Sequence, residues 1–341
     1  MKKLKTLVGP ILAAAIIFLL FVQIRRPRFF NSGCREVMGT FAQITIAAKN
    51  KQQAADFFAQ GFGQFEKVQR LMNDRDPNSE LSRLGADAVG KPVSVSPELF
   101  DVLQASVHYS QMTDGAFDIT VGPLTQLWRK TQQTGQLPCD ERLAEAKEKI
   151  GYQKIQLDPL AKTIQLEQDG MKLDLGGIAK GYAVDMAIQT LRQNGVSSGM
   201  VDLGGNIRCF GAGPGRGGAW LIGVQDPRND EKIILTLRLN DMAAATSGDY
   251  RRVAVVNGKP YSHIINPKTA QSVSELSGVT VIAASAMQAD ALSTAVSVLG
   301  KEKGLELLKS LPDVHAVLIA ADENAAPVFT ENAKNFILRQ N

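Results

Sequence analysis

The chain has 341 residues, of which 44% are hydrophobic and 21% are charged, so it has ample apolar material for a core and could form one large domain or two ordinary ones. Its formal net charge of +4 is small, and six basic residues close to the N-terminus account for more than all of it. The rest of the chain is slightly acidic, and we therefore expect no nucleic-acid partner. The six are Lys2, Lys3, Lys5, Arg25, Arg26 and Arg28.

An apolar run without a charge, LVGPILAAAIIFLLFVQI, occupies residues 7–24. At about 1.5 Å of rise per residue, a helix of this length covers most of a hydrocarbon core about 30 Å thick. We expect an uncleaved membrane anchor, with residues 1–6 as a basic tail and 25–35 as a linker. A cleavable signal peptide is the alternative, but basic residues rather than a small-x-small cleavage site follow the run. Basic residues flank both ends, so their distribution does not set the orientation.

The cysteines Cys34, Cys139 and Cys209 show neither metal-ligand spacing nor an even number. We expect buried or free thiols, and one disulfide is the alternative. Cys34 is separated from the apolar run by several residues, whereas a lipid-attachment cysteine would follow such a run directly. We therefore expect no lipid on Cys34.

Residues 36–338 contain no Pro/Gly-rich or low-complexity linker, which predicts one compact unit. The first elements are a strand over 41–47, a helix over 54–71, a loop over 73–78 and a helix over 97–112. Ser96 is a good N-cap for the last helix, with Pro97 at its first position.

Strands and helices are mixed in the later part of the chain without strict alternation, which favours an α+β fold over a doubly wound sheet. The predicted strands cover residues 233–239, 252–256, 279–283 and 314–320, and the predicted helices cover 286–299 and 301–311.

The segment LDLGGIAKGYAVD, residues 173–185, breaks an apolar run at two glycines, and DLGG returns at 202–205. Helical spacing between the two copies predicts a strand, a turn, a helix and a second strand. Glycines that open a helix let a ligand approach the free N–H groups of the first turn, which favour an anion. Lys180 in that turn opposes the helix dipole, and a bound phosphate would remove the conflict. A solvated lysine is the alternative.

Residues 213–218 formally match the pattern G-x-G-x-x-G of dinucleotide-binding sites. Such a fingerprint must open a helix, but the following residues, AWLIGVQDP, have the character of a strand. We therefore interpret the match as a loop.

Asp290 and Thr294 lie four residues apart on a predicted helix and share one face. A carboxylate and a hydroxyl one turn apart suit Mg²⁺, which takes one or two carboxylates with waters and ligand phosphates. The alternative is a capping Asp and a Thr bonded back to a carbonyl. Thr246-Ser247-Gly248-Asp249 is a candidate phosphate cradle or a plain turn. His263 is one of only three histidines, and it is a candidate for either a structural or a catalytic role.

Seven motifs occur in one order over most of the chain: Met38-Gly39-Thr40, Gly115-Ala116-Phe117-Asp118, LDLGGIAKGYAVD, VDLGGN, TSGDY, HIINPKTA and ADALSTA. In this order and at these separations the sequence resembles the FAD:protein FMN transferase family, also called the ApbE family, from residue 36 to the C-terminus. The resemblance implies an α+β catalytic domain with a mixed, T-fold-like sheet.

The resemblance also implies a flavin and a metal site. Mg²⁺ would be held by the Gly177 carbonyl, Asp290 and Thr294, and His263 would be the catalytic base beside the catalytic Asp290. At Arg75 the family usually has an aromatic residue against the flavin ring, and a guanidinium could stack there instead. The positions implied to bind FAD are Met38, Arg75, Ala116, Phe117, Asp118, Asp174, Lys180, Thr246, Ser247, Gly248 and His263.

The implied reaction is Mg²⁺-dependent transfer of FMN from FAD to a threonine hydroxyl of a target protein, with release of AMP. The alternatives are a FAD pyrophosphatase that yields FMN and AMP, and a non-enzymatic flavin-binding protein. In the family, the target threonine lies in a short Asp/Gly/Ser/Thr motif on subunits of membrane redox complexes. The resemblance places the domain on the periplasmic side of a bacterial inner membrane, held by the single N-terminal anchor.

Overall fold

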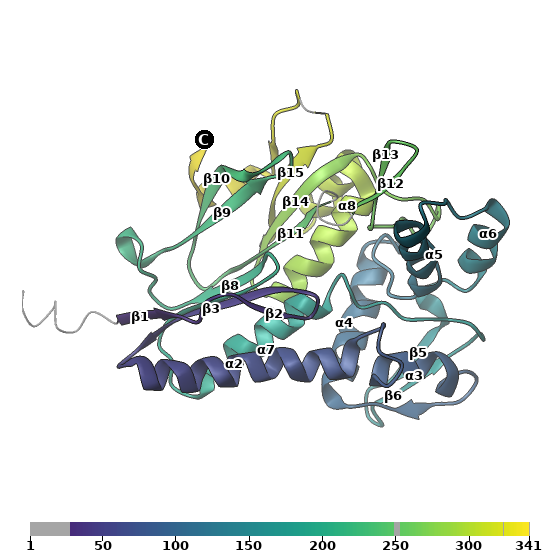
Figure 1. The fold of residues 1–341 in the computed structure, drawn as a ribbon, viewed down its shortest axis with the longest axis horizontal. Coiled ribbons are helices and arrows are strands. Elements are labelled where there is room, and N and C mark those ends of the chain that lie inside the picture. Colours follow the sequence, from purple (N-terminus) through teal and green to yellow (C-terminus); the bar gives the residue numbers. More distant parts are fainter. Residues whose placement is uncertain (1–27, 249–252, 323, 341) are drawn as a thin grey trace, which may run out of the picture.

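The computed structural model describes residues 28–248, 253–322 and 324–340, which are drawn as coloured ribbon in Figure 1. The predicted basic tail and membrane anchor at 1–24, and the beginning of the predicted linker, lie outside these residues. Among the described helices, none is both long and apolar enough to cross a membrane.

A nine-stranded sheet forms the centre of the described fold. Its strand pairs are all antiparallel, so the α+β class is confirmed but the prediction of a mixed sheet is wrong. In spatial order the strands are β1 (Arg28–Asn31), β3 (Thr40–Ala48), β7 (Gly199–Leu203), β8 (Asn206–Phe210), β11 (Ala243–Gly248), β14 (Leu276–Ala283), β15 (His315–Ala320) and β16 (Val328–Phe329), and β2 (Arg35–Val37) pairs with β3.

One face of this sheet packs against helices and the other against a second, three-stranded sheet (Figure 1). Neighbouring residues of β14 show the division: Val281 belongs to the helix-side core and Ile282 to the core on the opposite face, as expected for side chains that alternate along a strand. The helices are α2 (Lys51–Met72), α7 (Ala179–Gln193) and α8 (Ala286–Lys309), and the smaller sheet contains β17 (Ile337–Gln340), β10 (Asn229–Leu239) and β9 (Trp220–Asp226).

The remaining elements gather at one end of these layers, on the right in Figure 1. The helices are α3 (Glu80–Asp87), α4 (Pro97–Met112), α5 (Gly122–Thr134) and α6 (Asp140–Glu148), and the strands are β4 (Val93–Ser94), β5 (Ile155–Asp158), β6 (Thr163–Leu166), β12 (Val253–Val256) and β13 (Lys259–Ser262). A third apolar cluster, which includes Leu124, Trp128 and Ile265, joins α5 and α6 to the segment that follows hairpin β12–β13.

Most predicted elements are confirmed. The helix predicted at 97–112 is α4, and the Ser96 hydroxyl accepts a hydrogen bond from the Leu99 N–H at 3.4 Å. The glycines at 213–218 form a loop that leads into β9. The strand predicted before the first DLGG motif is wrong, because only single backbone contacts form there: a bridge at Lys172 and a hydrogen bond from the Asp174 N–H to the Ile119 carbonyl.

The two helices predicted at 286–299 and 301–311 are the two parts of α8, which is broken at Gly300 (φ 76°, ψ −175°). The second part folds back on the first, since a Cβ on Gly304 would lie 2.8 Å from Val296 Cγ1. The Glu275 carboxylate accepts from the Lys301 N–H at 2.8 Å and so caps the second part. This reversal lets the chain enter β15 antiparallel to β14, whereas one straight crossover helix would favour a parallel strand.

We predict that Gly181→Ala separates α7 from α8. A Cβ on Gly181 would lie 2.3 Å from the Ala286 carbonyl oxygen, which belongs to rigid helical backbone. We expect a loss of about 1–3 kcal/mol in the free energy of unfolding, measured by urea denaturation. The matched control is Gly63→Ala in α2, where an added Cβ meets nothing within 4 Å and should stabilise the helix by about 0.5–1 kcal/mol. Equal stability of the two variants would contradict the close contact.

We also predict that the three thiols differ in reactivity. All three cysteines are free; Cys34 and Cys139 are exposed and Cys209 is buried. Burial raises the pKa of the Cys209 thiol to about 11, and only the thiolate is alkylated. Iodoacetamide at about pH 8 should therefore modify Cys34 and Cys139 in the folded protein, and Cys209 only after unfolding. Mass spectrometry without reductant checks this, and resistance of Cys139 together with Cys209 would instead indicate a disulfide.

Candidate functional site

A cavity of about 430 Å³ opens where the N-terminus of α7, the first half of α8, the loop after α2 and the end of hairpin β12–β13 meet. Its volume is within the usual range for small-molecule sites. All fourteen residues predicted for the site line this cavity, although they come from distant parts of the sequence. They are Met38, Arg75, Ala116, Phe117, Asp118, Asp174, Gly177, Lys180, Thr246, Ser247, Gly248, His263, Asp290 and Thr294.

Asp290 connects α8 to the first turn of α7. One of its carboxylate oxygens accepts from the Gly181 N–H at 3.0 Å, and both oxygens lie 3.4 Å from Lys180 Nζ. Lys180 Nζ also donates to the Gly176 carbonyl at 2.8 Å. The conflict between Lys180 and the helix dipole is therefore offset by a carboxylate of the protein itself, where the sequence had suggested a phosphate or solvent. Asp290 is only 3% exposed, so this pairing compensates a buried charge.

A second carboxylate fixes the start of α8. Asp185 on α7 accepts from the N–H groups of Ala286 (3.0 Å) and Met287 (2.9 Å), and its carboxylate pairs with Arg208 of β8 at 2.6 Å. Burial raises the pKa of Asp185. Asp290 and Asp185 therefore hold the first turns of α7 and α8 against each other.

The residues predicted to hold Mg²⁺ lie close together. A Cβ on Gly177 would be 2.9 Å from Thr294 Oγ1, so the glycine backbone and the hydroxyl are in contact distance. One carboxylate, one hydroxyl and one carbonyl suit Mg²⁺, which retains waters and ligand phosphates. The described part of the chain contains no cluster of three or more His, Cys, Asp or Glu side chains that could hold a metal without such help.

The alternative interpretation of Asp290 and Thr294 is partly observed. Asp290 does cap a helix, namely α7. Close to these two residues, the Ser293 and Ser297 hydroxyls donate to carbonyls of α8, at 2.9 and 2.8 Å. Metal binding by Asp290 and Thr294 stays a prediction. Their oxygen atoms, together with the Gly177 carbonyl, are of the kind that Mg²⁺ binds.

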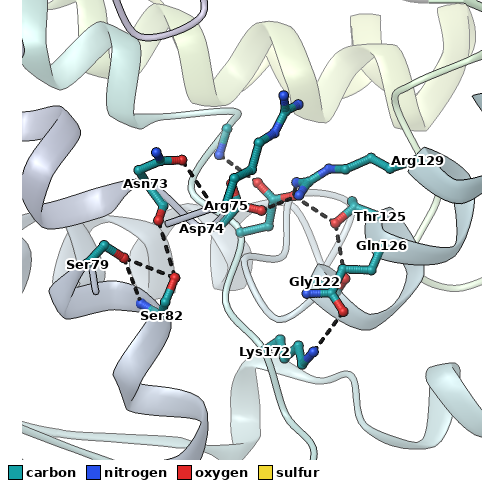
Figure 2. A network of polar contacts seen from close by, with 12 residues as sticks. Asn73, Asp74, Arg75, Ser79, Ser82, Gly122, Thr125, Gln126, Arg129 and Lys172 are labelled. Carbon is teal, nitrogen blue, oxygen red and sulfur yellow. Dashed lines mark hydrogen bonds and ion pairs between the residues drawn. The ribbon is translucent and has the colours of Figure 1, made fainter. Parts of the chain in front are cut away.

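Asp174 organises the glycine turn. One carboxylate oxygen accepts from the Gly176 N–H at 2.8 Å, and the other accepts from the Thr125 hydroxyl at 2.7 Å and an Arg129 nitrogen at 2.6 Å. The other terminal nitrogen of Arg129 pairs with Asp74, and Figure 2 shows this contact between α5 and the loop after α2. Both oxygens of Asp174 are thus engaged by the protein.

Asp118 braces a loop in the same manner. One of its oxygens accepts from the Thr120 N–H and hydroxyl at 2.8 and 2.6 Å, and the other from the Tyr152 N–H at 2.9 Å. Burial raises the pKa of this carboxyl. The neighbouring Phe117 ring lies against Gly177, with 3.3 Å from a ring carbon to an added Cβ.

Two predicted residues enter the cavity from the side of α2. Met38 has a positive φ of 52°, unusual for a residue with a side chain, and its N–H donates to the Gln69 side chain at 2.7 Å. Arg75 is exposed, and Figure 2 shows its guanidinium pointing away from the contact of Arg129 with Asp74. Arg75 therefore lines the cavity with an exposed side chain, and its contact with a flavin stays a prediction.

His263 follows β13 and is exposed at the cavity, between buried Ser262 and Ile264. The hairpin that carries it rests on α5: the rings of Trp128 and Tyr261 lie 5.5 Å apart, and Trp128 Nε1 donates to the Ala270 carbonyl at 3.1 Å. These contacts fix the position of the segment from which His263 projects.

Sequence reasoning missed the residues of the cavity wall that come from α5, from the loop before α3 and from β13. Nothing in the sequence distinguishes them, because α5 has an ordinary amphipathic pattern and the loop is simply polar. The missed residues include Asp74, Thr125, Trp128, Arg129 and Tyr261.

Comparisons with known proteins identify relatives of this chain. In the Treponema pallidum protein named FAD:protein FMN transferase, 32% of residues are identical over 304 residues, which cover 84% of this chain and 83% of that protein. The protein of the same name from Escherichia coli K12 is 32% identical over 280 residues, 80% of each chain.

Solved structures show the same fold. The ApbE protein of Thermotoga maritima superposes with a TM-score of 0.82 at 32% identity, covering 91% of this chain and 99% of that one. The flavin transferase ApbE of Vibrio cholerae superposes with a TM-score of 0.81 at 28% identity, covering 91% and 100%. The sequence model described as the ApbE family matches residues 38–318. The chain therefore belongs to the ApbE family.

Proposed function

We propose that this protein is a FAD:protein FMN transferase, which moves FMN from FAD to a hydroxyl of a target protein and releases AMP. The observation that carries the proposal is the convergence of all fourteen predicted residues on one cavity beside the N-terminus of α7. Relatives that bear this name are about one-third identical over most of the chain.

The reaction is a displacement at phosphorus, for which positioning and neutralisation of charge matter most. Lys180, in the first turn of α7, offers a cation to the FAD diphosphate. His263 accepts the proton of the attacking hydroxyl, and the oxygen–phosphorus bond forms as the bond between the two phosphates breaks, with AMP as the leaving group. Arg75, exposed at the cavity, offers a guanidinium face to the flavin.

Gly177 O, Asp290 and Thr294 would hold Mg²⁺ in this proposal. A divalent cation there would neutralise charge on the diphosphate and assist departure of AMP. The support is the closeness of Gly177 to Thr294 and the presence of the Asp290 carboxylate one turn earlier on the same helix.

We further propose that the acceptor is a threonine on a subunit of a membrane redox complex and that residues 7–24 anchor the protein in a bacterial inner membrane, with the catalytic domain in the periplasm. The uncharged run between two basic clusters supports the anchor. An anchored transferase would remain close to acceptors that are embedded in the same membrane.

The test is to incubate the full-length protein with FAD, Mg²⁺ and a redox subunit that carries the Asp/Gly/Ser/Thr motif, and to measure flavin fluorescence on the denatured subunit together with AMP release. A fluorescent subunit and AMP would establish the transferase. FMN and AMP in solution without modified subunit would indicate a pyrophosphatase or an unsuitable acceptor, and intact FAD would indicate a binding protein.

We predict that Asp290→Asn lowers AMP release by about 100-fold or more, because it removes the one carboxylate of the proposed cation site and leaves Lys180 without its charge partner. The control is Ser297→Ala. This change removes only a hydroxyl that donates to the Ser293 carbonyl, one turn earlier in α8. Circular dichroism checks that both variants fold. Parental activity with an unchanged Mg²⁺ titration in Asp290→Asn would refute the metal assignment.

We predict that His263→Ala slows transfer by about 10²- to 10⁴-fold, because a general base is lost, while FAD affinity changes little. Single-turnover rates and FAD titration separate the two effects. His108→Ala is the matched control, since His108 is exposed on α4 and does not line the cavity. Transfer at the parental rate in His263→Ala would exclude His263 as the base.

A further inference from the structure

Arg129 lies between two carboxylates that belong to different segments of the cavity wall. Its two terminal nitrogens make separate contacts: one pairs with Asp74, in the loop after α2, and the other with Asp174, before the glycine turn, at 2.6 Å. The exposed fractions of the three side chains are only 27% for Arg129, 21% for Asp74 and 10% for Asp174. The charges are therefore only weakly screened by water.

The contact with Asp174 reaches the backbone of the glycine turn. Asp174 holds the Gly176 N–H with the oxygen that Arg129 does not contact. Thr125, one turn before Arg129 on α5, donates to the same oxygen as Arg129. Helix α5 thus supplies two donors that orient one carboxylate, and this carboxylate orients the turn that leads to Gly177 and Lys180.

The contact with Asp74 holds the loop that presents Arg75. Within this loop the Asn73 side chain accepts from the Arg75 N–H at 3.1 Å, and the Asn73 carbonyl accepts from the Ser82 hydroxyl at 3.2 Å (Figure 2). The guanidinium of Arg129 joins this loop to α5, as Figure 2 shows. Arg129 therefore connects two segments of the cavity wall, the loop of Asp74 and the glycine turn after Asp174.

The charges explain why an arginine is needed at this position. Burial and the negative charge of Asp174 raise the pKa of Asp74, whereas Arg129 and, more weakly, Arg75 lower it. Without Arg129, two carboxylates would face each other in the wall of a cavity that must admit an anionic diphosphate. Their repulsion would move the loops apart, and their charge would disfavour the ligand.

We propose that Arg129 is a positioning residue of the flavin site: it bridges Asp74 and Asp174, offsets their repulsion, and so holds the glycine turn and the loop of Arg75 in the geometry that accepts FAD. The proposal rests on the proposed function for the identity of the ligand. We call the two ion pairs of Arg129, with Asp74 and with Asp174, the clamp. The clamp is a property of the protein without ligand, so the clamp and the proposed function can be tested separately.

The first test compares FAD affinity of the full-length protein and its variants by quenching of flavin fluorescence. Arg129→Gln should weaken binding by about 10-fold or more at pH 8, and the loss should shrink as the pH is lowered, because burial and the charge of Asp174 raise the pKa of Asp74. Asp74→Asn in the Arg129→Gln background should recover affinity at pH 8 to within about 3-fold, because one of the repelling charges is gone. Arg129→Lys, which keeps the charge but has one nitrogen instead of two, should give an intermediate affinity.

Lys130→Gln is the matched control, since Lys130 is the exposed neighbour of Arg129 on α5 and does not line the cavity. It removes the same charge from the same helix and should leave FAD affinity and its pH profile unchanged. A loss in Arg129→Gln that is independent of pH and is not recovered by Asp74→Asn would overturn the proposal, because it would mean that Arg129 contacts FAD directly or only supports the fold.

The second test needs no flavin. Hydrogen exchange of the peptides that cover residues 73–79 and 174–178 should accelerate in Arg129→Gln and not in Lys130→Gln. Unchanged exchange in Arg129→Gln would refute the clamp. If the parental protein binds no FAD while exchange responds as expected, the proposed function fails and the clamp stands.

Discussion

The contact between the first turns of α7 and α8 is the constraint on which the rest of the site depends. Gly181 allows the two helices to approach so closely that the Asp290 carboxylate of one can accept from the backbone of the other. Asp185 makes the reciprocal contact from α7 to the first N–H groups of α8. Each helix thus receives an anion at its N-terminus from the other, which satisfies backbone donors that a helix cannot satisfy internally.

The cavity illustrates how a protein can line an anion site with carboxylates. Asp290 is matched by Lys180 and a backbone N–H, Asp174 by Arg129 and Thr125, and Asp118 by two backbone N–H groups and a hydroxyl. Each carboxylate fixes a loop or a helix end, and its oxygens are engaged by donors of the protein. The lining can then remain favourable to a diphosphate, because Lys180 and Arg129 offset part of the negative charge of the wall.

Close packing at glycines and support from α5 complete the site. Gly177 leaves room for Thr294 and Phe117, so that a backbone carbonyl and a side-chain hydroxyl can lie in the same small volume. Elsewhere in the wall, Trp128 of α5 supports the hairpin that leads to His263. The next residue, Arg129, holds the loop of Asp74 and the glycine turn after Asp174. Helix α5 has no predicted role in the chemistry, yet it positions three segments that do.

The sequence by itself determined the main elements, and it named the candidate site residues. Periodicity and capping predicted α2 and α4, and the two helices predicted at 286–299 and 301–311 are the two parts of α8, because these signals are local and do not depend on distant residues. The order of seven motifs, compared with a known family, named fourteen residues that line one cavity. Only the tertiary structure decided how the strands pair, that no strand precedes the first DLGG motif, that Asp290 is the partner of Lys180, and that Arg129 joins Asp74 to Asp174. These contacts join residues far apart in the chain, such as Ala42 with Leu203 in the sheet and Lys180 with Asp290 in the site, and no local pattern encodes them. They form only when packing brings separate segments together, and in the site it brings their charges into one poorly hydrated place.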